Sequence, residues 1–277
     1  MRGKNILPRA MLLHINAIFP FLYPMRYVLG GRVFAGFYRY AIDFLAYRKA
    51  DSLIHSGFPL KIRNTFPCLL DRYDDAGSLP THYFWQDLWG ARKIFNSGVK
   101  RHYDIGSRLD GFVAHCLPFC EIVMLDIRPL KATIKNLSFL QANGTDMSTI
   151  PDDSLESFSS LHAVEHFGLG RYGDPIDPLG YKKAIMEIQR VVKPAGEIYF
   201  SVPIGIERLE FNGHRIFYPH TVLKLFHQCD LVEFSVIDDE NMFHENIEPS
   251  RFSSLKYGCG LFHFRKRLNQ PVQASAQ

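Results

Sequence analysis

The sequence predicts an α/β fold in which helices cover a mostly parallel sheet, with a helical arm at the N-terminus. Beyond residue 100, short apolar runs alternate with segments of helix length, which is typical of parallel strands joined by crossover helices. Hydrophobic residues form 47% of the 277-residue chain and charged residues 22%. These are globular proportions, so they exclude a disordered or fibrous chain.

Seven apolar runs are expected to form strands, at 101–105, 121–126, 137–141, 156–162, 196–202, 231–237 and 259–265. Helices are expected at 109–117, 129–136, 179–192 and 219–228. The last two strands lack a helix of comparable length between them, which favours an antiparallel hairpin at one sheet edge. This pattern divides the chain into a helical arm and lid (1–99), a ligand-binding domain (100–268) and a disordered tail (269–277).

The N-terminal arm carries the positive charge of the chain. Residues 1–50 contain eight Lys and Arg residues and one acid, Asp43, so their net charge is +7 although the whole chain carries +4. A basic arm indicates either nucleic acid or an anionic membrane surface as a partner. Nucleic acid is disfavoured, because the arm is too apolar for a surface that follows a phosphate backbone.

The apolar part of the arm is too short for a membrane span. The stretch from 10 to 25 has no charged residue, but it contains Pro20 and Pro24 and falls short of the roughly 20 residues that a span needs. Helices at 10–23 and 27–47 would lie either on the membrane surface or on the body as a lid. We therefore expect a cytoplasmic protein, which the membrane-surface alternative would make peripheral on the inner face of the membrane.

The cysteines do not indicate disulfides or a metal site. Five of them are scattered along the chain without a CxxC pair, which favours a reducing compartment. Cys116 and Cys120 share a predicted helix face and are expected in the core. His162 to His166 fits the H-x-x-E-H zinc motif, but that motif needs a helix and this segment ends a strand, so no metal is predicted.

A glycine turn and a strand-terminal acid predict a nucleotide-like ligand. The segment 102–111 runs from a strand through Gly106 into a helix, where backbone N–H groups can bind an anionic group. Twenty residues later, Asp126 ends the second strand. An acid at that spacing is placed to accept both hydroxyls of an adenosine ribose.

Further segments, at 143–147, 150–158, 160–167 and 188–203, follow the glycine turn in order. This series resembles the class I S-adenosylmethionine-dependent methyltransferases, well over about 100–205 and loosely over 206–265. The segments THYFWQDLWGARKIF and VEHFGLGRYGDPIDPLG more narrowly resemble an uncharacterised methyltransferase-like family often linked with bacterial surface-polysaccharide genes. The resemblance implies a Rossmann-like domain that uses S-adenosyl-L-methionine as its cofactor.

The resemblance also implies roles for single residues. Asp104 and Gly106 would hold the methionine end, Asp126 the ribose, and Ile127 would pack on adenine. Asp146 would accept from the adenine amino group, with Met147 beside the ring. The expected cofactor-binding residues are Asp104, Gly106, Ser107, Asp126, Ile127, Asp146, Met147 and His162. The chain departs from the usual pattern at Arg108, Asp110, Glu156 and Ala195.

The acceptor side is predicted from the segment after the fourth strand. The loop 168–180 holds Arg171, Tyr172 and Asp174, whose donors and acceptors suit a hydroxylated ligand such as a sugar or glycan. Transfer to oxygen needs a base. The candidates are His166, then Glu165, then His214. Trp85 and Trp89 precede the first strand and would form either core packing or a cofactor lid.

Two classes of function therefore remain open. The first is an O-methyltransferase that acts on a sugar, a glycan or another hydroxylated small molecule. The second is a protein with a methyltransferase-like fold but no cofactor, serving as an assembly or membrane-associated interaction module. The altered glycine turn favours the second, whereas Asp126 and Asp146 favour the first.

Overall fold

The computed structural model describes residues 32–55, 57–58, 60–73, 77 and 81–268. The chain divides into two compact units, Met1–Ser78 and Leu79–Gln277. The helix expected at 10–23 and the tail expected to be disordered lie outside the described residues. The boundary falls before the segment 81–97, which the sequence assigned to the arm but which belongs to the second unit.

Among the residues described in the first unit, the long helix is α3 (Arg32–Ile54), which covers most of the helix expected at 27–47 and continues beyond it. Gly36 is its buried residue, and a Cβ there would lie 2.4 Å from the carbonyl oxygen of Leu69. Asp43 forms an ion pair of 2.8 Å with Arg72. Among the described residues, no helix has both the length and the apolar character that crossing a bilayer requires.

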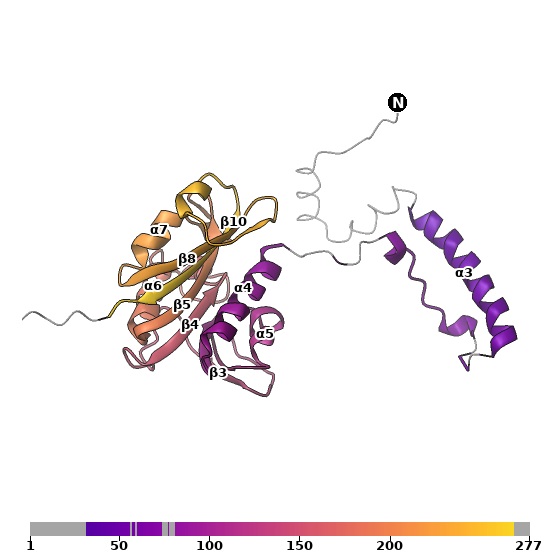
Figure 1. The fold of residues 1–277 in the computed structure, drawn as a ribbon, viewed down its shortest axis with the longest axis horizontal. Helices are drawn as coiled ribbons and strands as arrows, with labels where there is room; N and C mark the ends of the chain where they lie inside the picture. The colour runs from indigo at the N-terminus through magenta and orange to yellow at the C-terminus, as the bar shows by residue number, and fades with distance from the viewer. Residues whose placement is uncertain (1–31, 56, 59, 74–76, 78–80, 269–277) are drawn as a thin grey trace, which may run out of the picture. The chain divides into compact units, whose positions relative to one another are not determined.

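The second unit is built on an eight-stranded sheet in the order β3-β2-β1-β4-β5-β10-β8-β9 (Figure 1). Its first five strands are parallel, and β10 runs antiparallel to both neighbours. The strands are β1 (Arg101–Ile105), β2 (Glu121–Asp126), β3 (Leu137–Gln141), β4 (Leu155–Leu161), β5 (Val192–Ile204), β8 (Cys229–Ile237), β9 (Phe243–His244) and β10 (Gly258–Lys266). The predicted Rossmann-like α/β fold and the antiparallel pairing of the last two predicted strands are confirmed.

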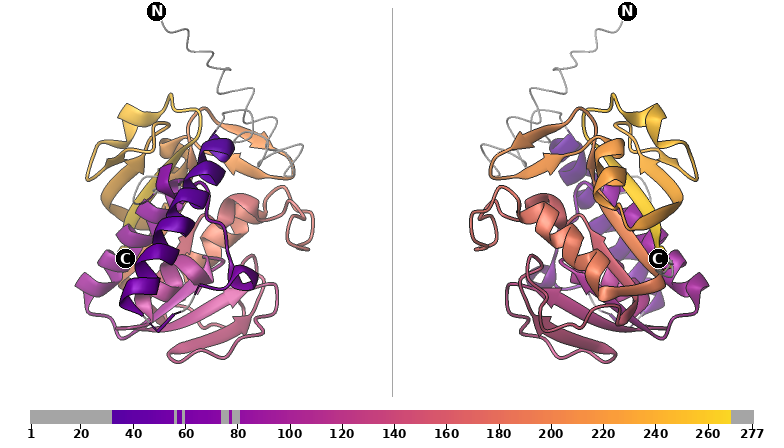
Figure 2. Two further views of the ribbon diagram at one scale, coloured as in Figure 1. Left: turned by 90° about the vertical axis from the view of Figure 1, so that its right-hand side faces the viewer. Right: turned by 90° about the vertical axis from the view of Figure 1, so that its left-hand side faces the viewer.

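Helices cover both faces of this sheet (Figures 1 and 2). One face packs against α6 (Gly180–Val191) and α7 (Pro219–Leu225), and the other against α4 (Thr81–Ser97) and the short α5 (Ala114–Cys116). In α6 the buried side chains recur at helical spacing, as in Ala184, Ile188 and Val191, so one apolar stripe faces the sheet. The sheet is thereby buried on both sides, which explains why its central strands are apolar runs.

Two predicted helices differ in the structure. Residues 129–136 form no helix, because the connection from β2 to β3 is shorter than the dozen or so residues that a helical crossover needs. The segment 109–117 is divided into a π-helical turn (Leu109–Val113) and α5, with a break at Gly111. A small second sheet of β6 (Arg208–Glu210) and β7 (His214–Ile216) lies outside the main sheet.

Candidate functional site

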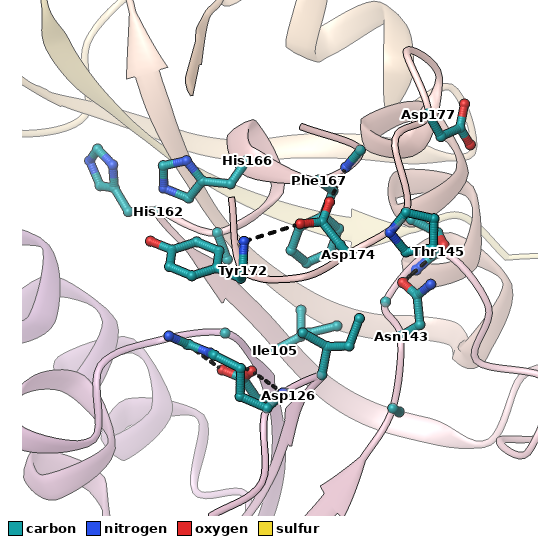
Figure 3. A pocket seen from close by; sticks show the side chains of 18 residues that line it. Ile105, Asp126, Asn143, Thr145, His162, His166, Phe167, Tyr172, Asp174 and Asp177 are labelled. Atoms are coloured by element: carbon teal, nitrogen blue, oxygen red, sulfur yellow. Dashed lines mark hydrogen bonds and ion pairs between the residues drawn. The ribbon is translucent and has the colours of Figure 1, made fainter. Parts of the chain in front are cut away.

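Two adjoining cavities open at the carboxyl ends of the parallel strands. They contain about 750 and 1210 Å³ of empty space, counting their open mouths. The chain turns back between β1 and β4 in the sheet order, and such a reversal is where open α/β sheets bind ligands. Both cavities are lined by Gly106, Arg128, His162, His166 and Tyr172. Figure 3 shows the first cavity, with side chains from four strand ends facing one space.

The glycine turn after β1 lines both cavities at Gly106. Gly106 has a φ of 75°, and a Cβ there would lie 2.7 Å from that of Ala163, so only glycine fits. Asp104 is fully buried and accepts hydrogen bonds from the backbone N–H (3.1 Å) and hydroxyl (2.6 Å) of Ser107. Burial raises the pKa of Asp104 to about 6. Asp104 lines neither cavity and holds the turn, whereas Ser107 lines the second cavity.

Asp126 faces the first cavity from the end of β2, and a cation of the chain already contacts it (Figure 3). Its Oδ1 accepts from the backbone N–H (2.8 Å) and Nε (3.0 Å) of Arg128, and its Oδ2 from Nη2 (2.7 Å). The guanidinium of Arg128 also lies 4.5 Å from the ring centre of Tyr172. Ile127, next to Asp126, lines the same cavity as predicted.

The wall opposite β2 comes from the segment after β3, with Ala142, Asn143, Gly144 and Thr145. The Asn143 side chain accepts from the backbone N–H (3.0 Å) and hydroxyl (2.9 Å) of Thr145, which fixes this turn. Asp146 and Met147, expected beside adenine, line neither cavity. Asp146 is exposed, and Met147 is buried in the core.

A buried carboxylate joins two histidines where β4 ends. His162 has a left-handed φ of 51°, and the following 3₁₀ turn, Val164–His166, carries Glu165 and His166. The Oε1 atom of Glu165 lies 2.9 Å from Nδ1 of His162 and 3.6 Å from Nε2 of His166. Burial alone would raise the pKa of Glu165, but the two imidazoles lower it below its ordinary value. Glu165 is thus an ionised group that orients the ring of His162 and lies beside the ring of His166.

His166 has one ring nitrogen engaged. Its Nδ1–H donates to the carbonyl oxygen of Gly213 at 2.6 Å, and a carbonyl can only accept, so the lone pair is on Nε2. Burial lowers the pKa of His166 below its ordinary value. A neutral imidazole with its lone pair on Nε2, lining the second cavity, can accept a proton there.

The loop after His166 supplies the predicted acceptor residues. Asp174 accepts from the backbone N–H of Gly168 (2.7 Å) and of Tyr172 (3.3 Å), so it shapes the loop (Figure 3). Arg171 and Tyr172 line the second cavity, and Asp174 lines the first. His214, on β7, lines the second cavity with Glu165 and His166. The three predicted base candidates are therefore brought together.

The structure adds residues that the sequence analysis did not assign to the site, Arg128 among them. Tyr83, Arg108 and Tyr257 line the second cavity, from α4, the glycine turn and the segment before β10. The tryptophans of α4 take the packing alternative and not the lid. Trp85 stacks on Phe243 with ring centres 5.6 Å apart, and Trp89 is buried in the core. The signal for Tyr83 was its place two residues before Trp85, in a segment that the sequence analysis had already singled out.

Comparison with known proteins gives no specific family for the whole chain. Residues 133–253, less than half of the chain, match a family described as a Caenorhabditis protein of unknown function, DUF268. No curated protein matches the sequence.

Solved structures resemble the second unit at low identity. The YcgJ protein of Bacillus subtilis is 13% identical and has a TM-score of 0.45, over 66% of this chain and 100% of its own. The N-methyltransferase NodS of Bradyrhizobium japonicum, solved with S-adenosylhomocysteine, is 14% identical with a TM-score of 0.47, over 73% of this chain and 93% of its own. The 1,6-didemethyltoxoflavin N1-methyltransferase of Burkholderia thailandensis is 12% identical with a TM-score of 0.44, over 70% and 94%.

Proposed function

We propose that the chain is an S-adenosylmethionine-dependent methyltransferase that methylates a hydroxyl of a sugar, a glycan or another hydroxylated small molecule. The observation that carries the proposal is the placement of Asp126. Its carboxylate ends β2 beside the Gly106 turn, at the reversal of the strand order, and faces a cavity within the size range of small-molecule sites.

The residues around the first cavity fit the adenosine part of this cofactor. Asp126 offers acceptors for the two ribose hydroxyls, and an ionised carboxylate has about four lone-pair sites, so it can share its oxygens with Arg128. At Gly106 a Cβ would collide with Ala163, so the turn that lines both cavities requires glycine. Ile127 and Phe167 supply apolar surface for the adenine ring.

The second cavity fits the methionine end and the acceptor. Ser107 and Arg108 lie at the glycine turn, where the guanidinium of Arg108 can pair with a carboxylate. Arg171, Tyr172 and His214 surround the remaining space with hydrogen-bonding groups suited to hydroxyls. Five residues line both cavities, which supports the proposal that the cofactor and the acceptor would meet between them.

The bound cofactor would supply an electrophilic methyl group on its sulfonium. The protein would align the acceptor with that methyl, and alignment alone can contribute about 7–11 kcal/mol. His166 Nε2 would take the proton of the acceptor hydroxyl, while Glu165 stabilises the imidazolium that forms. Glu165 and His214 line the same cavity and are the alternative bases.

The decisive experiment is a calorimetric titration of the full chain with S-adenosylhomocysteine. We expect binding, and we expect Asp126→Ala to weaken it by about 1.5–3 kcal/mol, the range for hydrogen bonds to charged groups. Asp230→Ala removes an exposed acid on β8 that lines neither cavity and is the matched control. Equal affinity of the wild type and Asp126→Ala would contradict the assignment of the cofactor site.

A non-enzymatic interaction module is the second candidate. The favouring observation is that Arg128 already holds both oxygens of Asp126, so the acid has a partner within the chain. If neither S-adenosylmethionine nor its product binds to the wild type, Arg128→Ala decides between the two candidates. Binding that appears in Arg128→Ala would show a site closed by its own cation, and continued absence of binding would favour the module.

A further inference from the structure

Three side chains with metal-binding atoms meet behind the end of β4. They are His82 on α4, His162 after β4 and Cys259 on β10, and their ligand atoms all lie within 4.8 Å of one another. His162 and Cys259 are buried, and His82 is half-buried. The three residues come from distant parts of the sequence, so no linear motif contains them.

The imidazole of His162 is already oriented for a ligand at this point. Its Nδ1 is held by Glu165 Oε1 at 2.9 Å, and its Nε2 is buried without a hydrogen bond to the described residues. A buried polar nitrogen without a partner is destabilising, and a bound ion would supply the missing partner. A carboxylate that fixes one ring nitrogen while the other binds an ion is the usual outer sphere of a metal-bound histidine.

The donor set selects the kind of ion. Two imidazole nitrogens and one thiolate are ligands of Zn²⁺, whereas Mg²⁺ and Ca²⁺ take oxygen ligands. Zinc bound by three protein side chains keeps a fourth position for water or another ligand. The cluster contains no carboxylate among its three donors, which further distinguishes it from a hard-cation site.

We propose that His82, His162 and Cys259 bind one Zn²⁺ ion. On binding, the Cys259 thiol loses its proton to solvent and the thiolate sulfur forms the bond to the metal. The ion would join α4 to the ends of β4 and β10. Tyr83, next to His82, and Tyr257, two residues before Cys259, line the second cavity, so the ion would also hold that wall in place. This inference does not depend on methyl transfer.

The test is a titration of the full chain, freed of metal by a chelator, with Co²⁺ followed by Zn²⁺. We expect one equivalent of Co²⁺ to produce visible bands of tetrahedral cobalt and a thiolate-to-cobalt charge-transfer band, both removed by Zn²⁺. Cys259→Ser should remove the charge-transfer band, and His82→Gln should weaken metal binding by at least tenfold. Glu165→Gln should weaken it about 10–100-fold, as removal of an outer-sphere partner does.

Cys229→Ser is the matched control, because Cys229 is also a buried strand cysteine but lies outside the cluster. It should bind cobalt as the wild type does. Circular dichroism reports folding of each variant, and His82→Gln, at a half-buried position, decides the matter if Cys259→Ser does not fold. The proposal is overturned if the wild type binds no equivalent of cobalt, or if His82→Gln binds as tightly as the wild type. Rapid alkylation of Cys259 without cobalt binding would also overturn it and would indicate a reactive thiol instead.

Discussion

His166 is the residue whose environment best defines a chemical role. The carbonyl of Gly213 holds its Nδ1–H, so the ring has one orientation and one tautomer. Burial lowers the pKa of this ring, so the neutral form already predominates at neutral pH. The sequence predicted an ordinary histidine that would gain activity through about pH 6–7.5.

The lowered pKa moves the expected pH profile. A base works only when it is deprotonated, so activity should rise with pH through the His166 pKa and then level off. Because burial lowers that pKa below its ordinary value, the rise in rate should lie further to the acid side than for an ordinary histidine. The measurement is the turnover number against pH at saturating S-adenosylmethionine, with a hydroxylated acceptor found by screening.

His166→Ala should lower that turnover by about two orders of magnitude or more while cofactor binding persists. His220→Ala, an exposed histidine on α7, is the control and should change neither quantity. His162→Ala should instead weaken cofactor binding, because that side chain lines both cavities. If His166→Ala keeps near-full activity while Glu165→Ala or His214→Ala loses it, the base is one of those residues.

At the scale of single elements, α4 is held to the sheet by Trp89. Trp89 is 3% exposed, packs edge-on against Tyr199, and belongs to the core cluster beneath the helix. Trp89→Ala should lower the free energy of unfolding by about 3–5 kcal/mol, measured by urea denaturation. Phe95→Ala, an exposed aromatic on the same helix, should cost less than about 1 kcal/mol. Similar losses in both variants would mean that α4 is not anchored through Trp89.

The parallel strands could be predicted from the sequence because short runs with apolar residues alternate with longer segments beyond residue 100. The runs at 101–105, 121–126 and 137–141 match β1, β2 and β3. The helix expected at 129–136 was wrong, since local pattern does not report how little chain the crossover has. The conformation of Ala195 could not be predicted either. Its φ of 61° is one that glycine prefers, and an alanine does not indicate such a turn.

The residues of the site also fall into those that local sequence predicted and those that it did not. Gly106, Asp126, Ile127, His162 and His166 follow strand ends, so local sequence predicted that they would meet. Tyr257 reaches the second cavity, and Cys259 reaches the cluster with His82 and His162, only because β10 inserts between β5 and β8. That insertion is a property of the whole sheet, and no short segment of the sequence encodes it. Asp146 shows the opposite error, since a residue in the expected motif turned outward.

At the scale of the whole molecule, the positive charge is concentrated in the N-terminal segment of the chain. Residues 1–50 carry eight basic residues and one acid. We expect the full chain to bind anionic vesicles, with affinity that falls as salt is raised, because exposed charges are screened beyond about 10 Å at 0.1 M salt. Each basic residue near such a surface contributes about 1 kcal/mol.

Replacing Arg39, Arg48 and Lys49 of α3 by Gln should therefore weaken vesicle binding about 100-fold in a sedimentation assay. S-adenosylhomocysteine affinity should not change. The matched control replaces three exposed lysines of the second unit, Lys131, Lys135 and Lys224, and should bind vesicles as the wild type does. Equal binding to neutral and anionic vesicles would contradict electrostatic attachment.

The position of Arg128 has a thermodynamic consequence for the two cavities. One guanidinium pairs with Asp126 in the first cavity and lies over Tyr172, which lines both. A ligand that draws Asp126 away from Arg128 changes what holds Tyr172, so the occupancy of one cavity alters the affinity of the other. Such coupling is reciprocal by necessity, and an acceptor that binds more tightly after the cofactor must tighten the cofactor by the same factor.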